Sequence, residues 1–330
     1  MLATTLLTAV APPAASGAAS APVIHYPPDE LVVSGKGVVH VLAELPAGAH
    51  REIDVRITGG PGVKVTAVEH RERGTVFHAP VQLAPGLNTI AITVTTGGAT
   101  VTVARRIFHL VPLSKDTVPP PRFVRRPFHQ TGIERACAGC HVLVPRPEDA
   151  APSAPEQSTC HSCHSRMTAT PEVHGPAALW ACTRCHDARG APAVHGVPDP
   201  VMPLCFSCHI EQQERFLGNR YQHGPTATGH CTICHDPHGT DHRFFIKKAA
   251  WNLCTTCHIE KASGRHVISW GPGGQSHPTR GKPDPTRPGR ELSCASCHNP
   301  HAAPAPKLWN FKATIWLDLC RNCHSSLMGG

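Results

Sequence analysis

Apolar and polar residues alternate along residues 23–112, a stretch that is rich in valine, isoleucine and threonine. Alternation with a period of two in residues of this kind predicts β-strands. Glycine- and proline-containing turns separate about seven such runs: ELVVSG, VVHVLAEL, EIDVRIT, VKVTAVEH, TVFHAPVQL, NTIAITVTT and ATVTVARRIFHL. Short strands at this spacing indicate an all-β antiparallel sandwich.

The pattern ends at a proline-rich segment, residues 113–124, which we expect to be a linker. Residues 125–330 have short segments, few long apolar runs and many Gly-Pro pairs. A chain of about 200 residues normally buries a sizeable core of side chains. We therefore predict a second domain in which large apolar cofactors replace much of that core.

The chain begins with an apolar and small-residue segment, residues 1–22, that resembles a secretory signal although it lacks a positively charged start. Pro12 and Pro13 interrupt it, and it is too short to span a membrane. We expect this segment to direct export, which places the protein in the periplasm or at the cell surface.

Sixteen cysteines lie in residues 125–330, and all of them belong to eight Cys-x-x-Cys-His motifs. The motifs come in four pairs, with separations of 23, 23, 23 and 26 residues between the first cysteines of a pair. A histidine stands eight residues before the first cysteine of three pairs, and 17 residues before it in the fourth. The simplest interpretation is four tandem units of two motifs each.

Cys-x-x-Cys-His is the attachment signature of c-type haem, because two thiols on one turn can form thioethers and the next histidine can bind the iron. Zinc sites and disulfides would not require a histidine after every pair. We therefore expect eight covalently bound haem c groups. The expected thioether residues are Cys137, Cys140, Cys160, Cys163, Cys182, Cys185, Cys205, Cys208, Cys231, Cys234, Cys254, Cys257, Cys294, Cys297, Cys320 and Cys323. The expected proximal ligands are His141, His164, His186, His209, His235, His258, His298 and His324.

The sixth ligand of each iron decides whether a haem is closed or can bind a substrate. The haem region offers eleven further histidines, whereas the whole chain has only four methionines. Four histidines hold the same upstream place in the four units, and we expect them to bind the first haem of each pair. They are His129, His174, His223 and His277.

His238 and His301 match each other, since each stands three residues after a proximal histidine. We expect them at neighbouring haems, the second of their pairs, with His195 as the equivalent in the second unit. The first unit lacks such a residue, so His161 is the nearest substitute, and the second haem is the one whose closure is least secure. His230, His242 and His266 are reserves.

The formal net charge of +8 could suggest nucleic acid as a partner. Eight haems would add about sixteen negative charges through their propionates, however, and ferric iron returns roughly one positive charge each. The loaded protein is then near neutral or acidic, so we expect no nucleic-acid partner. Lysine and arginine are better explained as propionate partners and surface charges.

The segment HGPTATGHCTICHDPHG and its repeats resemble the doubled-CxxCH family of multihaem cytochromes, which includes cytochrome c3-like domains and periplasmic decahaem conduit subunits. The resemblance covers residues 129–330. It implies bis-histidine haems stacked in a row, within mostly coil and short helices. LAPGLNTIAITVTTGGATVTVARRI resembles bacterial immunoglobulin-like modules, which implies an immunoglobulin-like fold for residues 23–112.

Three functions fit these observations. The leading hypothesis is an electron carrier, not an enzyme, whose partners are other redox proteins or an extracellular acceptor. The second is an octahaem reductase with one open haem, acting on nitrite, hydroxylamine or tetrathionate. The third is a subunit of a cytochrome filament, which would self-associate.

Overall fold

The computed structural model describes residues 21–45, 52–57, 63–66, 68–70, 74–96, 99–111, 118–135, 137–139, 141–190, 194–263, 266 and 277–324. The chain divides into two compact units, which are described separately. The first extends to Leu110 and includes Val118–Arg126, and the second contains Pro127–Gly330. The signal-like segment lies outside the described residues except for its last two positions.

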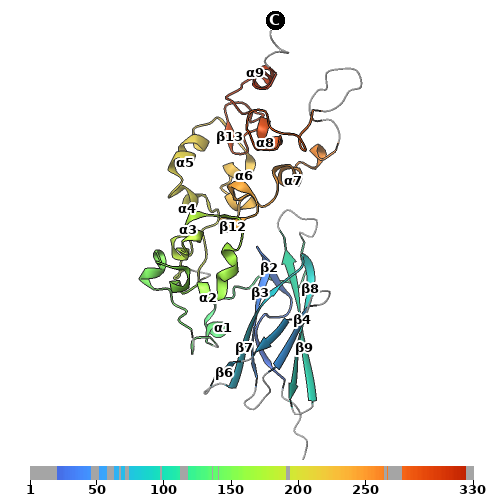
Figure 1. The fold of residues 1–330 in the computed structure, drawn as a ribbon, viewed down its shortest axis with the longest axis vertical. Helices are drawn as coiled ribbons and strands as arrows, with labels where there is room; N and C mark the ends of the chain where they lie inside the picture. The colour runs from blue at the N-terminus through green and yellow to red at the C-terminus, as the bar shows by residue number, and fades with distance from the viewer. Residues whose placement is uncertain are drawn as a thin grey trace, which may run out of the picture. The chain divides into compact units, whose positions relative to one another are not determined.

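The first unit contains two β-sheets (Figure 1). One has the strand order β1-β3-β7-β6 and the other β2-β9-β8-β4-β5. The described strands are β1 (Val23–Tyr26), β2 (Leu31–Ser34), β3 (Val38–Leu45), β4 (Glu52–Ile57), β5 (Val63–Thr66), β6 (Val68–His70), β7 (Gly74–Gln82), β8 (Gly86–Thr96) and β9 (Ala99–Leu110). The predicted β-region is therefore present at residues 23–110.

Two details of the strands differ from the sequence prediction. The expected run VKVTAVEH is divided between β5 and β6, which pair with β4 and β7 in different sheets. The pairing of β2 with β9 is parallel, whereas the other strand pairs of these two sheets are antiparallel. A parallel pair needs a long connection, and nearly the whole unit lies between these two strands.

Alternate residues along the central strands form the core of the first unit. Phe77, Ala79 and Val81 of β7 are at most 2% exposed, and Ile90 and Ile92 of β8 are fully buried. Burying a side chain of the size of isoleucine contributes roughly 1.5–3 kcal/mol. The period of two that predicted the strands therefore also identifies the residues that stabilise this unit.

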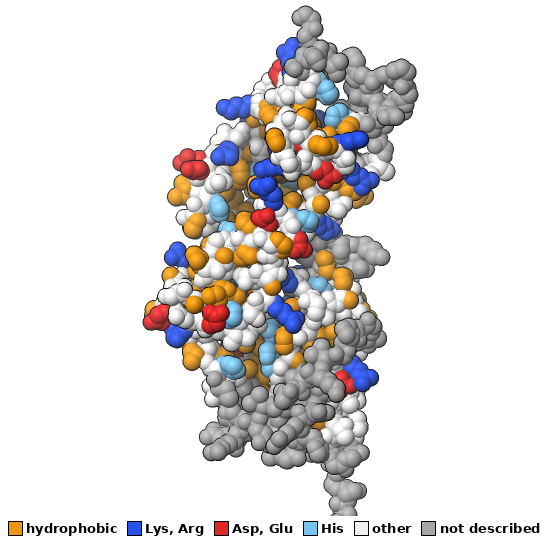
Figure 2. Space-filling model, in the orientation of Figure 1, with side chains coloured by type: hydrophobic (Ala, Val, Ile, Leu, Met, Phe, Trp, Pro, Cys, Tyr) orange, Lys and Arg blue, Asp and Glu red, His pale blue; other side chains and the backbone are white. Residues whose placement is uncertain are grey.

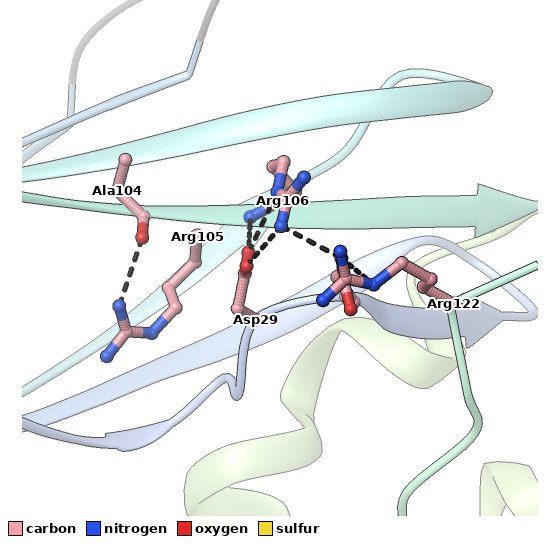
Figure 3. Close-up of polar contacts among 6 residues, drawn as sticks. Asp29, Ala104, Arg105, Arg106 and Arg122 are labelled. Atoms are coloured by element: carbon pink, nitrogen blue, oxygen red, sulfur yellow. Dashed lines mark hydrogen bonds and ion pairs between the residues drawn. The ribbon is translucent and has the colours of Figure 1, made fainter. Parts of the chain in front are cut away.

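Arg106 on β9 joins the segment before β2 to the sheet (Figure 3). Its Nη2 atom lies 2.7 Å from Asp29 Oδ2 and 2.9 Å from Glu30 Oε1. Its backbone N–H also donates to Asp29 Oδ1 at 2.7 Å. Arg122 Nε lies 3.3 Å from Glu30 Oε1, and the Val124 N–H donates to the Glu30 carbonyl. Residues 118–124, the described part of the expected linker, thus lie against β2.

The variant Asp29→Asn is expected to lower the melting temperature of the β-sheet unit by a few degrees near neutral pH. The hydrogen bond from Arg106 holds the pKa of Asp29 at about 2, below the value of about 3.9 in an unfolded chain. A depressed pKa stabilises the folded state above the unfolded value, and this stabilisation disappears as the pH falls through about 2. Calorimetry of the complete chain measures the effect.

The matched control for this prediction is Asp54→Asn, because Asp54 pairs with Arg56 two residues away on its own strand. This local and exposed pair is expected to contribute less than the contact between β9 and the distant Asp29. A difference between Asp29→Asn and wild type that persisted undiminished down to the folded-state pKa would contradict the assignment.

The second unit is mostly coil with short helices, as expected. Its helices are α1 (Thr131–Glu134), α2 (His161–His164), α3 (Gly175–Ala178), α4 (Met202–Phe206), α5 (Ile210–Leu217), α6 (Gly224–Ala227), α7 (Ala250–Thr255), α8 (Cys294–Cys297) and α9 (Trp316–Arg321). The 3₁₀ turns are Pro147–Ala150, Pro155–Gln157, Ser165–Thr168, Cys182–Arg184, Cys231–Ile233, Arg243–Phe245 and Ile259–Lys261.

Two short antiparallel ladders join successive repeats of the second unit. In the first, β10 (Glu172–Val173) pairs with β12 (Gly239–Thr240). In the other, β11 (Tyr221–Gln222) pairs with β13 (Ala302–Ala303). Each ladder connects a segment directly before an upstream histidine with a segment directly after a CxxCH motif.

The second unit buries few large apolar side chains of its own. Trp180, Val201, Phe206 and Leu292 are the large apolar side chains below 9% exposure among its described residues. Many others lie at the surface, and Figure 2 shows apolar side chains spread over the face in view. Ile259, for example, is 71% exposed in the polypeptide alone. The polypeptide thus leaves much of its apolar surface for something else to cover. Among the described residues, no helix has both the length and the apolar character that crossing a membrane requires.

Candidate haem-binding sites

Each CxxCH motif forms one turn of helix. The backbone N–H of each motif histidine donates to the carbonyl of the first cysteine four residues earlier, at 2.9–3.0 Å in all eight motifs. A closed turn of this kind brings residues three and four apart onto one side. The described cysteines have free thiols, which stand in for thioether sulfurs, and Cys140 lies outside the described residues. The local geometry therefore suits attachment to a single haem.

The second motif of every unit has a histidine ring facing its proximal histidine. In each case the facing ring is the upstream histidine of the same unit, and the ring centroids are 6.0–6.2 Å apart. The pairs are His129–His164, His174–His209, His223–His258 and His277–His324.

The first motifs of the later units are faced by histidines from outside the unit or from the connecting segment. His186 of the second unit faces His238 of the third, and His235 of the third unit faces His301 of the fourth, both at 6.0 Å. In the fourth unit, His298 faces His266 at 5.9 Å. Since no unit follows the fourth in the described chain, His266 takes the place that a following unit would fill.

These separations fit one iron atom between two imidazoles. With metal–nitrogen bonds of about 2 Å on both sides, and about 1.1 Å from each nitrogen to its ring centroid, the centroids would lie roughly 6.3 Å apart. The observed distances are 5.9–6.2 Å in seven pairs. The residues present therefore fit bis-histidine haem, which would supply the redox chemistry.

The first motif is different. Among the described residues, its proximal His141 is the one motif histidine that no other histidine ring faces. The imidazole of His141 is exposed in the polypeptide. The sequence had instead singled out the second haem as the least secure, but the structure gives that motif His129 as a partner.

The structure differs from the sequence prediction in how the histidines are distributed. The upstream histidines face the second motif of each unit, not the first. His238 and His301 face the first motif of the preceding unit. The reason is that the short ladders bring these segments beside the neighbouring unit: the His174 N–H donates to the His238 carbonyl, and the His223 N–H to the His301 carbonyl.

His161 and His195 do not face a proximal histidine. The ring of His161 packs edge-on against Trp180 at 4.6 Å, and that of His195 packs edge-on against His129 at 4.6 Å. His129, Glu134 and His195 thereby form a cluster of possible metal ligands. Since His129 already faces His164, this cluster lies beside the second motif's site and belongs to it.

His266, which sequence reasoning held only in reserve, faces His298. A signal for it existed by elimination, since His298 has no following unit to supply a ligand. Sequence reasoning missed a second set of residues that orient the proximal rings.

The orienting groups are backbone carbonyls nine residues after the proximal histidine. His186 Nδ1 lies 2.8 Å from the carbonyl oxygen of His195, and His235 Nδ1 lies 2.8 Å from that of Phe244. His298 Nδ1 lies 2.7 Å from that of Lys307. A proton held on Nδ1 by such a bond leaves Nε2 free to bind a metal.

Burial keeps several of these imidazoles in the neutral form, which is the form that binds metals. Burial, and next the neighbouring His129, lower the pKa of His164 to about 4. Burial, and next the neighbouring His235, do the same for His301. The pKa values of His174, His186, His223, His235 and His266 are also lowered, with burial as the largest cause.

Cysteines of successive motifs lie close together along the chain. Between units, the first cysteines are hydrogen-bonded, which lowers the pKa of one thiol and raises that of the other. These pairs are Cys160–Cys182, Cys205–Cys231 and Cys254–Cys294. Within units, the second cysteines interact electrostatically and, together with the larger effect of burial, this raises thiol pKa values. These pairs are Cys185–Cys208, Cys234–Cys257 and Cys297–Cys323. Thioethers do not titrate, but their proximity links the second to the eighth motif without a gap.

A family model for the doubled CXXCH motif matches residues 174–214, 223–263 and 287–329. These matches fall on the second, third and fourth units. They support a multihaem c-type cytochrome with haem c bound covalently at CXXCH motifs. No curated protein matches the chain.

Several solved structures resemble about a quarter of the chain. An engineered protein is 21% identical over 28% of this chain and 21% of its own, with a TM-score of 0.22. The endo-β-1,4-mannanase from Thermotoga petrophila is 14% identical over 27% and 19%, with a TM-score of 0.23. The fibronectin(III)-like modules of Clostridium thermocellum CbhA are 13% identical over 28% and 98%, with a TM-score of 0.21. The chain spans about a fifth of the length of the first two structures.

One prediction concerns Asp236, which positions His238. The Asp236 carboxylate accepts a hydrogen bond from the His238 backbone N–H at 3.0 Å and lies 3.1 Å from its Nδ1. The variant Asp236→Ala is expected to weaken ligation at the third motif and to produce a fraction of high-spin iron. Electron paramagnetic resonance of the oxidised protein measures that fraction.

The matched control is Asp236→Asn, because Asn299 makes the same backbone contact to His301 at 3.0 Å. This variant is expected to keep the iron low-spin. It removes a negative charge beside the ligand, so the potential of one centre should rise. An unchanged spectrum in Asp236→Ala would show that the carboxylate has no positioning role.

Proposed function

We propose that the chain carries eight haem c groups and transfers electrons along them in the order of the motifs. The observation that carries this proposal is the set of seven histidine pairs at an iron-sized separation. An iron with two histidine ligands has no place for a substrate, which favours an electron carrier over an enzyme at these seven sites.

The cysteine contacts support a continuous path. Because each motif from the second to the eighth has a cysteine beside a cysteine of the next, the attached edges of successive haems would be close neighbours. Bis-histidine ligation favours lower potentials than a histidine–methionine pair. We therefore propose a low-potential path through the second unit of the fold.

The cellular setting and the first unit belong to the same proposal. Haem c attachment outside the cytoplasm and the signal-like residues 1–22 favour a periplasmic or cell-surface location. The partners would be other redox proteins or an extracellular acceptor. We propose that the β-sheet region is an immunoglobulin-like interaction or spacer module.

Two measurements on the purified, full-length protein test the proposal. Intact mass spectrometry and haem absorbance should give eight haems for each chain. A spectroelectrochemical titration should show most centres at low potential, and all of them should exchange electrons with an electrode. A smaller number of haems, or centres that are all at high potential, would overturn the corresponding part.

A further inference from the structure

The first haem site lacks the residue that closes the equivalent sites. His238 closes the third motif and His301 closes the fifth, and each is the third residue after a proximal histidine of the following unit. By the same rule, the ligand for the first motif should come three residues after His186. That residue is Arg189.

The structure supports this equivalence through the backbone. The Arg189 N–H donates to Asp187 Oδ1 at 2.8 Å. The His238 N–H makes the same bond to Asp236, and the His301 N–H makes it to Asn299, both at 3.0 Å. All three residues therefore occupy the same turn after a CxxCH motif.

His195 is not the displaced ligand. Its carbonyl accepts the hydrogen bond from His186 Nδ1, as the carbonyl of Phe244 accepts that of His235. The two residues also share a left-handed backbone, with φ of 60° and 61°. His195 is thus the counterpart of Phe244, and no insertion separates the loops of the second and third units.

An arginine cannot replace histidine as a ligand. Its guanidinium remains protonated and has no acceptor site, and Arg189 is exposed. Other histidines of this unit are engaged elsewhere: His161 packs on Trp180, His195 packs on His129, and His230 lies 3.0 Å from Thr228 Oγ1.

We propose that the haem attached at the first motif has an open sixth position and binds a small exogenous iron ligand of the size of carbon monoxide. The open position follows from Arg189, which stands where the repeat otherwise supplies histidine. This inference rests on the haem loading proposed above. It adds a ligand-binding site to a chain whose other haems are closed.

Carbon monoxide titration of the reduced, full-length protein tests the inference, after mass spectrometry has counted the haems. The wild type is expected to bind one carbon monoxide per eight haems, and its oxidised form to show one high-spin centre. The variant Arg189→His should install the missing ligand and reduce carbon monoxide binding from one to none. Arg189→Ala should still bind one.

The reverse substitution provides an independent arm. His238→Arg copies the first site at the third motif and should raise carbon monoxide binding from one to two per chain. Eight haems with no carbon monoxide bound in the wild type would overturn the inference, since a ligand would then come from elsewhere in the chain or from a second copy. Unchanged binding in Arg189→His, or in His238→Arg, would overturn the role of this position. A haem count other than eight would instead refute the proposed loading.

Discussion

Loss of the fourth haem is expected to divide the electron path into two parts. In the double variant Cys205→Ala and Cys208→Ala, the fourth motif can no longer attach haem. The cysteines of this motif make contacts on both sides, with Cys185 of the third motif and Cys231 of the fifth. With the protein held on an electrode by its C-terminal end, fast voltammetric scans should then reach only the haems of the fifth to eighth motifs.

The matched control removes a haem from the end of the path. Cys137→Ala and Cys140→Ala leave seven haems as well, but the contacts between the second and eighth motifs stay intact. All seven should respond at every scan rate. If both variants responded alike at fast scan rates, electrons would not pass through the fourth haem, and the linear path would be wrong.

A methionine in place of His301 is expected to raise the potential of one centre strongly. His301 faces His235 at 6.0 Å, and Phe216 stacks on its other side at 4.3 Å. Methionine ligation raises the potential of haem iron. Because axial ligands tune haem potentials over about 0.8 V, a shift on the order of 0.1 V or more is expected for the fifth haem. A spectroelectrochemical titration resolves this as one centre leaving the low-potential group.

The control for this variant is His230→Met, which changes an exposed histidine that faces no proximal ring. Its potentials should match those of the wild type. An unchanged titration curve in His301→Met would mean that His301 does not bind iron. A shift of comparable size in His230→Met would mean that the effect does not depend on axial ligation.

The sequence alone predicted the β-region and the repeating motifs, because both depend on local patterns. Alternation at a period of two located strands such as β8, and the spacing of cysteines located every turn that suits haem attachment. These signals involve residues that are close together in the chain, so no knowledge of the tertiary path was required.

The distribution of the distal histidines could not be predicted in the same way. His129 and His174 lie nearer in sequence to the first motif of their units, yet they face the second. His238 crosses to the preceding unit because a two-residue ladder places it there. The similar spacing of His195 to a motif suggested a ligand, but only the hydrogen bond from His186 shows that its carbonyl is the part that serves the site.

The exchange of ligands between neighbouring units has a consequence for how such a chain can change in length. A two-haem unit is not self-sufficient, since its first iron would borrow a histidine from the unit that follows. Insertion or deletion of a whole unit in the middle keeps every junction the same, so the number of haems can grow in steps of two without redesign. Only the ends require new solutions. At one end His266 supplies the closure, and at the other the exchange stops at Arg189.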